Sequence, residues 1–293
     1  MAFVLGIDGG GTSCRAALAL PDGTVLGRAT SGPANIRTDL TGARENIVDA
    51  ARKAFLDAGR DPALIRDTHA VLGLAGSNVG TYWQQLETIL PFAKSRVVTD
   101  ALIALEGAVG EGDGAMAILG TGTAYMVRKN GAARAIGGWG FQVGDQGGGS
   151  RIGRELLEET LLAHDGIRPA SPLTAEILAV FRNEPQDVVE FTINAKPGDY
   201  GGFAPKVFDF AAEGDAVAQA IVARAVRAVE ASLAALDLDG SSPLCLLGGL
   251  APLYAERLSQ EYRQLLKPPR QDALGGAVAM ASRMFASLEK AGG

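Results

Sequence analysis

One arrangement of short segments occurs twice in this chain, and this repeat limits the possible folds more than any other feature. An apolar run suited to a buried strand leads into a glycine-rich turn. A second strand-like run follows directly, and a tight turn precedes a third run. The first copy covers residues 4–29 and the second covers residues 115–136. Such a repeat indicates two related units. The sequence therefore predicts an α/β fold of two domains, each opening with a three-stranded antiparallel meander on a mixed sheet.

Helical and strand-like segments alternate after the first copy. Apolar residues recur at helical spacing over residues 41–58, and Asp61-Pro62 is typical of a helix start. Asp100 directly follows a predicted strand, in a position where an aspartate is commonly an N-cap. The other predicted segments are a strand over 70–75, a helix over 81–90, a strand over 96–99 and a helix over 101–109.

The second copy continues into a glycine-dense stretch over residues 137–150. Ser150 is a candidate N-cap for a helix that ends at His164, and Asp215 begins a long amphipathic helix. The other segments are helices with irregular connections over 166–214, a strand over 243–247 and a closing helix over 275–288. These segments predict an N-terminal domain over 1–110, with the helix 275–293 as a candidate addition, and a C-terminal domain over 111–274.

Charge and composition exclude several classes of function. The formal net charge is −6 and no run of Lys or Arg occurs, so we expect neither nucleic acid nor a membrane surface as a partner. No apolar stretch approaches the ~20 residues of a membrane span, and the chain enters its first strand without a signal-peptide pattern. Cys14 and Cys245 lie in strand-like runs, which predicts buried reduced thiols in a cytoplasmic protein. His69 and His164 show no metal-ligand spacing.

Four predicted strands end in polar or glycine-rich turns, and ligands of α/β folds bind at the carboxyl ends of strands. The turns are Asp8 to Thr12, Asp100, Gly120 to Thr123, and Gly248-Gly249.

The turn Gly9-Gly10-Gly11 contains more glycine than a hairpin needs. The chain has no P-loop pattern, and this turn lacks the spacing and the following helix of a dinucleotide site. A turn without side chains lets backbone N–H groups approach an anion closely. We therefore expect it to bind nucleotide phosphates, with Asp8 holding the accompanying metal. For Gly120 to Thr123 taken alone, an ordinary turn explains the residues equally well, and Asp145 is equally compatible with a turn former.

Five motifs, in their order along the chain, resemble one family. They are Ile7-Asp8-Gly9-Gly10-Gly11-Thr12, Thr99-Asp100-Ala101, Gly120-Thr121-Gly122-Thr123, Gly137-Gly138-Trp139-Gly140 with Gly144-Asp145-Gln146-Gly147, and Leu247-Gly248-Gly249. Together they resemble the N-acetylglucosamine kinase branch of the BadF/BadG/BcrA/BcrD ATPase family, within the actin/hexokinase/Hsp70 superfamily. The likeness covers essentially the whole chain, and the segment around Trp139 is its most specific part.

The resemblance implies two ribonuclease-H-like domains of the actin-like ATPase type, with ATP and a sugar bound in an interdomain cleft. It implies that Asp8 positions Mg²⁺ through water and that Asp100 is the base facing the sugar hydroxyl. The implied ATP-binding residues are Gly9, Gly10, Gly11, Thr12, Gly120, Thr121, Gly122, Thr123, Gly248 and Gly249. The implied sugar-binding residues are Asn35, Gly138, Trp139, Gly140 and Asp145.

The expected activity is ATP-dependent phosphorylation of the 6-hydroxyl of an amino sugar by a homodimeric enzyme. N-acetylglucosamine is the preferred acceptor and glucosamine the alternative, because the loop 75–78 could face either 2-substituent. A more distant alternative is an activator of 2-hydroxyacyl-CoA dehydratase, but that function needs cysteines on exposed loops. A sugar-sensing module is disfavoured because the chain has no appended helix-turn-helix and no basic face.

Overall fold

The computed structural model describes residues 2–78 and 80–290. The chain divides into two compact units. The first consists of Met1–Gly112 together with Pro269–Gly293, and the second is Asp113–Pro268. Each is described below by itself.

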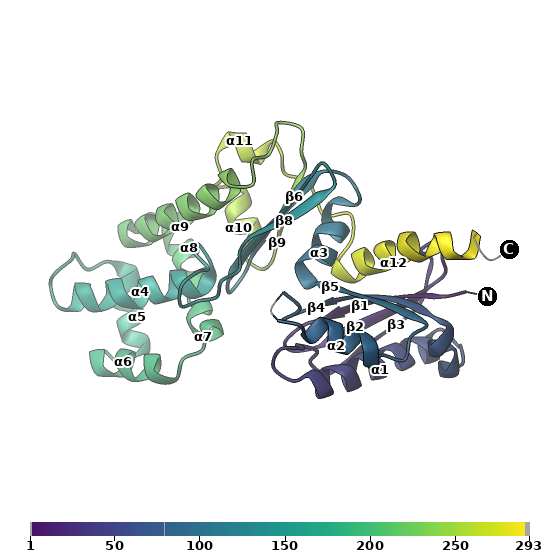
Figure 1. Cartoon of the computed structure of the whole chain (residues 1–293). Helices are drawn as coiled ribbons and strands as arrows, with labels where there is room; N and C mark the ends of the chain where they lie inside the picture. The colour runs from purple at the N-terminus through teal and green to yellow at the C-terminus, as the bar shows by residue number, and fades with distance from the viewer. Residues whose placement is uncertain (1, 79, 291–293) are drawn as a thin grey trace. The chain divides into compact units, whose positions relative to one another are not determined.

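The first unit is built on a five-stranded mixed sheet with the order β3-β2-β1-β4-β5 (Figure 1). Its strands are β1 (Val4–Gly9), β2 (Cys14–Ala19), β3 (Val25–Ser31), β4 (His69–Leu74) and β5 (Lys94–Thr99). The first three form an antiparallel meander, whereas β4 and β5 run parallel to β1. The register places Gly9, Leu74 and Thr99 level with one another. The turns that follow these three residues therefore lie at one edge of the sheet.

Helices cover both faces of this sheet, because side chains on β1 alternate between them. Leu5 and Ile7 pack in the core under α1 (Leu40–Asp57) and α2 (Tyr82–Ile89). Val4 lies in a second core on the opposite face, under α3 (Asp100–Val109) and α12 (Ala273–Lys290). Figure 1 shows these pairs of helices on either side of the sheet. The short 3₁₀ helix η1 (Pro62–Asp67) precedes β4.

Glycines allow α12 to lie directly against its neighbours. A Cβ on Gly6 of β1 would come within 2.5 Å of the Val278 backbone nitrogen, and one on Gly276 would come within 2.1 Å of the Ile103 carbonyl oxygen. Side chains at these two positions would separate the helix from the sheet and from α3. Residues from the far end of the sequence are thus an integral layer of the first unit.

The second unit contains a four-stranded sheet with the order β8-β7-β6-β9. Its strands are β6 (Gly114–Leu119), β7 (Thr123–Lys129), β8 (Ala132–Gly137) and β9 (Leu244–Leu247). The first three form an antiparallel meander, and β9 runs parallel to β6. Asn130 and Gly131 join β7 to β8 with φ of 52° and 77°, as expected for the hairpin turn that this pair of residues favours. The prediction of an α/β fold with two mixed sheets, each opening with a meander, is confirmed.

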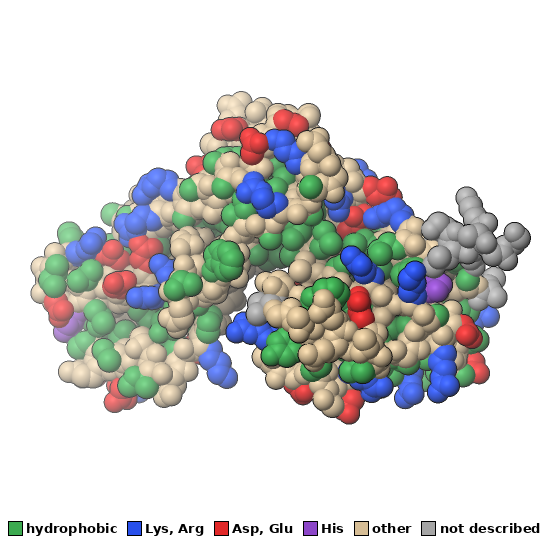
Figure 2. All heavy atoms as spheres, in the orientation of Figure 1, with side chains coloured by type: hydrophobic (Ala, Val, Ile, Leu, Met, Phe, Trp, Pro, Cys, Tyr) green, Lys and Arg blue, Asp and Glu red, His purple; other side chains and the backbone are tan. Residues whose placement is uncertain are grey.

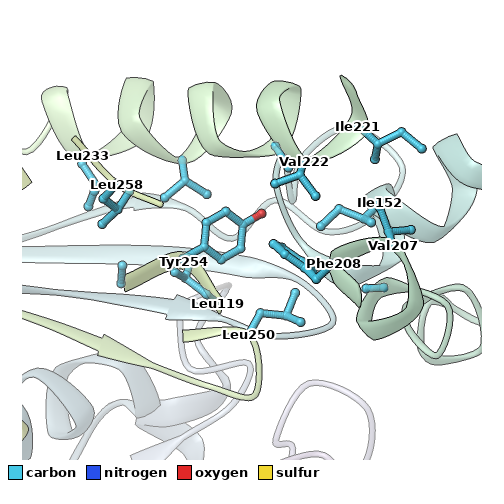
Figure 3. Close-up of a cluster of buried hydrophobic side chains, with 14 of the residues drawn as sticks. Leu119, Ile152, Val207, Phe208, Ile221, Val222, Leu233, Leu250, Tyr254 and Leu258 are labelled. Carbon is cyan, nitrogen blue, oxygen red and sulfur yellow. The ribbon is translucent and has the colours of Figure 1, made fainter. Parts of the chain in front are cut away.

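Helices pack around a large apolar core in this unit (Figure 3). They are α4 (Gly149–His164), α5 (Pro172–Val180), α6 (Pro185–Asn194), α7 (Pro197–Gly201), α8 (Ala204–Ala212), α9 (Ala216–Ala234), α10 (Ala251–Ala255) and α11 (Gln260–Arg263). Tyr254 lies fully buried among them, with its hydroxyl donating a hydrogen bond to the Gly147 carbonyl. This contact ties the core to the glycine-dense segment before α4.

Two expected helix caps are wrong, both by a small shift along the chain. Thr99 caps α3 by accepting a hydrogen bond from the Leu102 N–H, which makes Asp100 the first helical residue. Gly148 occupies the N-cap position of α4, and Ser150 lies inside the helix. The short helices α10 and α11 carry too little periodic sequence to be predicted. No helix among the described residues is long and apolar enough to cross a membrane.

Candidate active site

The first glycine turn is open on its outer side. The Gly10 N–H bonds to the Ser13 carbonyl and closes the β1–β2 hairpin. Neither Gly10 nor Gly11 has a left-handed φ, and a Cβ on Gly11 would meet no atom within 4 Å. Gly9 differs, because a Cβ there would lie 2.6 Å from Leu74 and 2.9 Å from Ala34. Packing thus accounts for Gly9, whereas neither backbone conformation nor packing requires a glycine at position 11, which faces open space.

Asp8 lies at the end of β1 and is held by an arginine that the sequence reasoning missed. Arg15 Nη2 and Nε lie 2.6 and 3.2 Å from Asp8 Oδ2, and Arg15 Nη1 lies 2.9 Å from Asp272 Oδ2. The hairpin register places Arg15 directly opposite Asp8, so the turn length and the strand pairing together contain the signal for this pair. Asp272, at the start of α12, could not be found in this way.

Asn35 lies in a segment that connects two strand ends of the first unit. The Ala34 N–H donates to the Gly10 carbonyl, and the Ile36 N–H donates to the Ala75 carbonyl. The Asn35 side-chain oxygen accepts a hydrogen bond from the Arg37 N–H at 3.1 Å. These bonds place Asn35 beside the glycine turn and the loop after β4. A planar amide there is suited to paired hydrogen bonds with neighbouring hydroxyls.

Asp100 lies at the same edge, as the first residue of α3. Its Oδ1 accepts a hydrogen bond from the Ala101 N–H at 2.8 Å. The residue keeps a solvent-exposed surface, but crowding by protein atoms raises the pKa of its carboxyl, and the negative charge of Asp8 raises it further. The bond from Ala101 acts in the opposite direction. A carboxyl whose charged form is disfavoured is better suited to accept a proton.

Cys14 is close to Asp8 but is not a candidate nucleophile. Burial raises the pKa of its thiol to about 12, and the charge of Asp8 contributes in the same direction. Both cysteines are buried, as the sequence predicts.

The second glycine turn is connected to Asp145. Asp145 Oδ1 accepts a hydrogen bond from the Thr123 N–H at 3.3 Å, and a Cβ on Gly122 would lie 2.5 Å from Asp145 Oδ2. Gly120, in contrast, has open space where its Cβ would be. The N–H groups of Gly149 and Ser150 donate to the carbonyls of Gly120 and Thr121. The start of α4 therefore fixes the turn, and Gly122 is glycine because Asp145 occupies the adjoining space.

The segment Gly138-Trp139-Gly140 follows β8 and adjoins this turn. The Gly138 N–H donates to the Thr123 carbonyl, and the Gly144 N–H donates to the Gly140 carbonyl. The Trp139 side chain is 77% exposed, so it takes no part in the core. The structure thus brings together Thr123, Asp145 and this segment within the second unit.

Gly248 and Gly249 follow β9, and their surroundings differ. Gly248 has a φ of 94°, and a Cβ on it would lie 2.4 Å from the Leu119 carbonyl oxygen. Gly249 is exposed, with no atom within 4 Å of a Cβ position. The fold therefore requires a glycine at position 248, whereas Gly249 exposes its backbone to solvent, as Gly11 does in the first turn.

Comparison with known proteins identifies the family. The model of the BadF/BadG/BcrA/BcrD ATPase family matches residues 5–276. The chain belongs to this family. A glucosamine kinase, GspK of Vibrio cholerae serotype O1, is 36% identical over 294 residues and covers 100% of both chains. An N-acetyl-D-glucosamine kinase of Dictyostelium discoideum is 25% identical over 309 residues, which are 94% of this chain and 96% of the relative.

Solved structures share the fold. One from Chromobacterium violaceum, named provisionally as an N-acetylglucosamine kinase, has a TM-score of 0.83 at 30% identity and covers 96% of this chain and 99% of its own. A ROK family glucokinase from Streptomyces griseus has a TM-score of 0.55 at 17% identity, with 96% and 99% covered. The resemblance to actin-like sugar kinases, expected from five motifs, is therefore confirmed at the level of family and fold.

Proposed function

We propose that the protein is an ATP-dependent kinase that phosphorylates the 6-hydroxyl of an amino sugar. The observation that carries the proposal is the position of Asp100 near Asp8, at the sheet edge that also holds the open first glycine turn. Phosphoryl transfer needs a group to orient the acceptor hydroxyl, a metal-positioning carboxylate and close electrostatic contact with phosphate oxygens. The kinases among the relatives support the same reaction.

In this proposal Asp100 accepts the proton of the acceptor hydroxyl as the hydroxyl attacks the γ-phosphate. A positioned base of this kind typically contributes about 10²–10⁴-fold to the rate. Asn35, Asp145 and the backbone of Gly138 to Gly140 hold the other polar groups of the sugar. Support comes from the location of these groups beside the glycine turns in their own units.

The phosphates of ATP are proposed to bind to bare backbone. Thr12 and Gly11 in the first turn are exposed, as are Thr121 in the second turn and Gly249 after β9. N–H groups that line an open turn can donate to phosphate oxygens without a lysine. Gly9 and Gly248, in contrast, have no room for a side chain and shape their turns from within.

The residues around Asp8 fit Mg²⁺, which proteins commonly hold through one or two carboxylates, water and substrate phosphates. Both Arg15 contacts reach Oδ2 of Asp8, so Oδ1 can face metal-bound water. No group of three or more His, Cys, Asp or Glu side chains in the described part of the chain could hold a metal. The ion would need the ATP phosphates as further ligands. When bound, it neutralises phosphate charge during transfer.

The acceptor is proposed to be N-acetylglucosamine or glucosamine, since the names of the relatives divide between these two sugars. A coupled assay with ATP and Mg²⁺ should compare both with glucose and N-acetylmannosamine. The ratio of kcat/KM for the two candidates identifies the acceptor. Absence of turnover with all four sugars would contradict the proposal.

Two further expectations stay predictions: a cytoplasmic location, where ATP is available, and a homodimer. Light scattering on the purified chain measures the second directly. The alternative of a dehydratase activator is weakened by the burial of both thiols, because a shared iron–sulfur cluster needs exposed cysteines.

A further inference from the structure

A charged cavity of about 460 Å³ lies between α4 and α9 of the second unit. This volume falls within the range of about 300–1,000 Å³ that is usual for small-molecule sites. Figure 2 shows basic and acidic side chains close together over these two helices. The charged residues of its lining are Arg151, Arg154, Glu155, Glu158 and Arg224.

Part of this charge is already neutralised within the protein. Arg224 on α9 forms ion pairs with Glu155 and Glu159 on α4, and Arg168 also contacts Glu159. Burial raises the pKa of Glu155, while the bond and charge of Arg224 lower it. This pairing joins α9 to α4 at the wall of the cavity. The charges of Arg151, Arg154 and Glu158 are not part of it.

Arg151 and Arg154 are cations without a carboxylate partner. Among the described residues neither forms an ion pair, and the one side-chain hydrogen bond of Arg151 is a 3.5 Å contact of Nη1 with the Phe141 carbonyl. Both lie near the start of α4, which has no acidic residue in its first turn. Positive charge at a helix N-terminus is unfavourable because the helix dipole is positive there. An anion in the cavity would interact favourably with both guanidinium groups and with the helix end.

Glu158 adds a negative charge one turn beyond Arg154. The spacing of Arg151, Arg154, Glu155 and Glu158 along α4 places them on one face of the helix. In the described structure Arg154 and Glu158 form no ion pair, although they are four positions apart on the helix. The cavity wall therefore offers a cationic part near the start of α4 and an anionic part farther along it.

We propose that this cavity binds a phosphorylated amino sugar, with the phosphate at Arg151 and Arg154 and the ammonium group at Glu158. Planar guanidinium groups are well suited to phosphate recognition. The choice of an amino-sugar phosphate rests on the proposed function with glucosamine as the acceptor, because the product, glucosamine 6-phosphate, then carries both a phosphate and an ammonium group. Gln146 and Gly147 also line the cavity. They directly follow Asp145, so the cavity between α4 and α9 lies next to the loop that contacts the second glycine turn.

Binding is best measured by calorimetry on the full chain with glucosamine 6-phosphate as the probe. An excess of the proposed acceptor with the higher kcat/KM, together with a non-hydrolysable ATP analogue, should be present to occupy the active site. We expect one saturable site that remains under these conditions. Glucose 6-phosphate, which lacks the ammonium group, and glucosamine, which lacks the phosphate, should both bind more weakly. Equal binding of glucose 6-phosphate would overturn the assignment of the ammonium group.

Arg154→Gln should weaken probe binding by at least about tenfold, because charge-assisted hydrogen bonds are among the strongest in proteins. Arg227→Gln is the matched control, since Arg227 lies on α9 but lines a different hollow. Glu158→Gln serves as a second variant if Arg154→Gln does not fold. Unchanged affinity in the cavity variants, or complete displacement of the probe by the active-site ligands, would overturn the proposal. If the probe binds but the protein phosphorylates no sugar, the second site is retained and the proposed function is rejected. If the protein phosphorylates a sugar but the probe does not bind, the proposed function is retained and the second site is rejected.

Discussion

Arg15 holds Asp8 through one carboxylate oxygen, with Nη2 2.6 Å and Nε 3.2 Å from Oδ2. The same guanidinium reaches Asp272 with its third nitrogen. One arginine thus joins the end of β1 to the start of α12. The Arg15 side chain is 41% exposed, so its ion pairs contribute little to stability, and their main effect is to orient Asp8.

Arg15→Gln should raise the KM for ATP about tenfold or more, since hydrogen bonds to charged groups contribute about 1.5–3 kcal/mol. The free energy of unfolding should change by less than about 1 kcal/mol, as is usual for exposed ion pairs. Steady-state kinetics and urea unfolding measure the two quantities. Asp272→Asn is the companion variant, because it keeps the oxygen that accepts from the Gly275 N–H and loses only the charge facing Arg15. A large loss of stability with unchanged kinetics in Arg15→Gln would contradict this role.

Asp100→Asn should lower kcat by about 10²–10⁴-fold, the usual contribution of a general base, with little change in the affinity for ATP. The amide preserves the shape of the side chain and its oxygen can still accept from the Ala101 N–H. Rapid-quench kinetics with saturating sugar isolate the chemical step. A decrease smaller than tenfold would exclude Asp100 as the base.

The same variant should be more stable than the wild type at neutral pH. The pKa of Asp100 is raised in the folded protein, so the folded state holds its proton more tightly than the unfolded state does. Wild-type stability from this group is therefore lost as pH rises from the unfolded pKa through the folded pKa. Unfolding midpoints for both proteins, measured from pH 4 to pH 8, should diverge with increasing pH. Parallel curves would show that burial and Asp8 impose no cost on the Asp100 carboxylate.

Gly122→Ala should raise the KM for the sugar, because its methyl group would lie 2.5 Å from Asp145 Oδ2 and would displace that carboxylate. Gly120→Ala is the control for folding, since its methyl group meets open space. Melting temperatures should be unchanged for Gly120→Ala and lowered slightly for Gly122→Ala. If Gly122→Ala binds sugar normally, Asp145 does not hold the sugar.

Gly6→Ala should destabilise the first unit by about 1–3 kcal/mol, the usual cost of inserting a methyl group into a packed interior. The methyl group would lie 2.5 Å from the Val278 backbone nitrogen. Trp83 lies against the core of this unit. Its fluorescence during urea unfolding, in a Trp139→Phe background, reports the unit selectively. Gly240→Ala, at an open position, should show the wild-type midpoint.

The sequence allowed most of the fold to be predicted because hydrophobic periodicity and turn composition act locally. The paired meanders and the helices α1 and α9 each have strong periodic patterns. The cap of α3 could not be assigned from the sequence, because Thr99 and Asp100 are both good capping residues and only the backbone geometry selects Thr99. Short helices such as α10 lack the length that a periodic pattern requires.

The candidate site was predictable where a motif is contiguous and was missed where it depends on tertiary structure. Asp8, Asp100 and the glycine turns are candidates that contiguous motifs indicate, but only the positions of neighbouring atoms show that packing requires Gly9 and does not require Gly11. Arg15 could be inferred from the hairpin register. Asp272 follows Arg15 by 257 positions, and no local pattern connects them.

The place of α12 in the first unit has a consequence for biosynthesis. The ribosome produces Pro269–Gly293 only after all of Asp113–Pro268 has been made, yet α12 covers part of one face of the first sheet. Domains generally fold as units during synthesis. The second unit can therefore complete its core on the nascent chain. Until α12 is made, the apolar side chains of β1 and β4 that pack against it have no cover from this helix. This apolar surface is therefore exposed on the nascent chain until α12 has been synthesised.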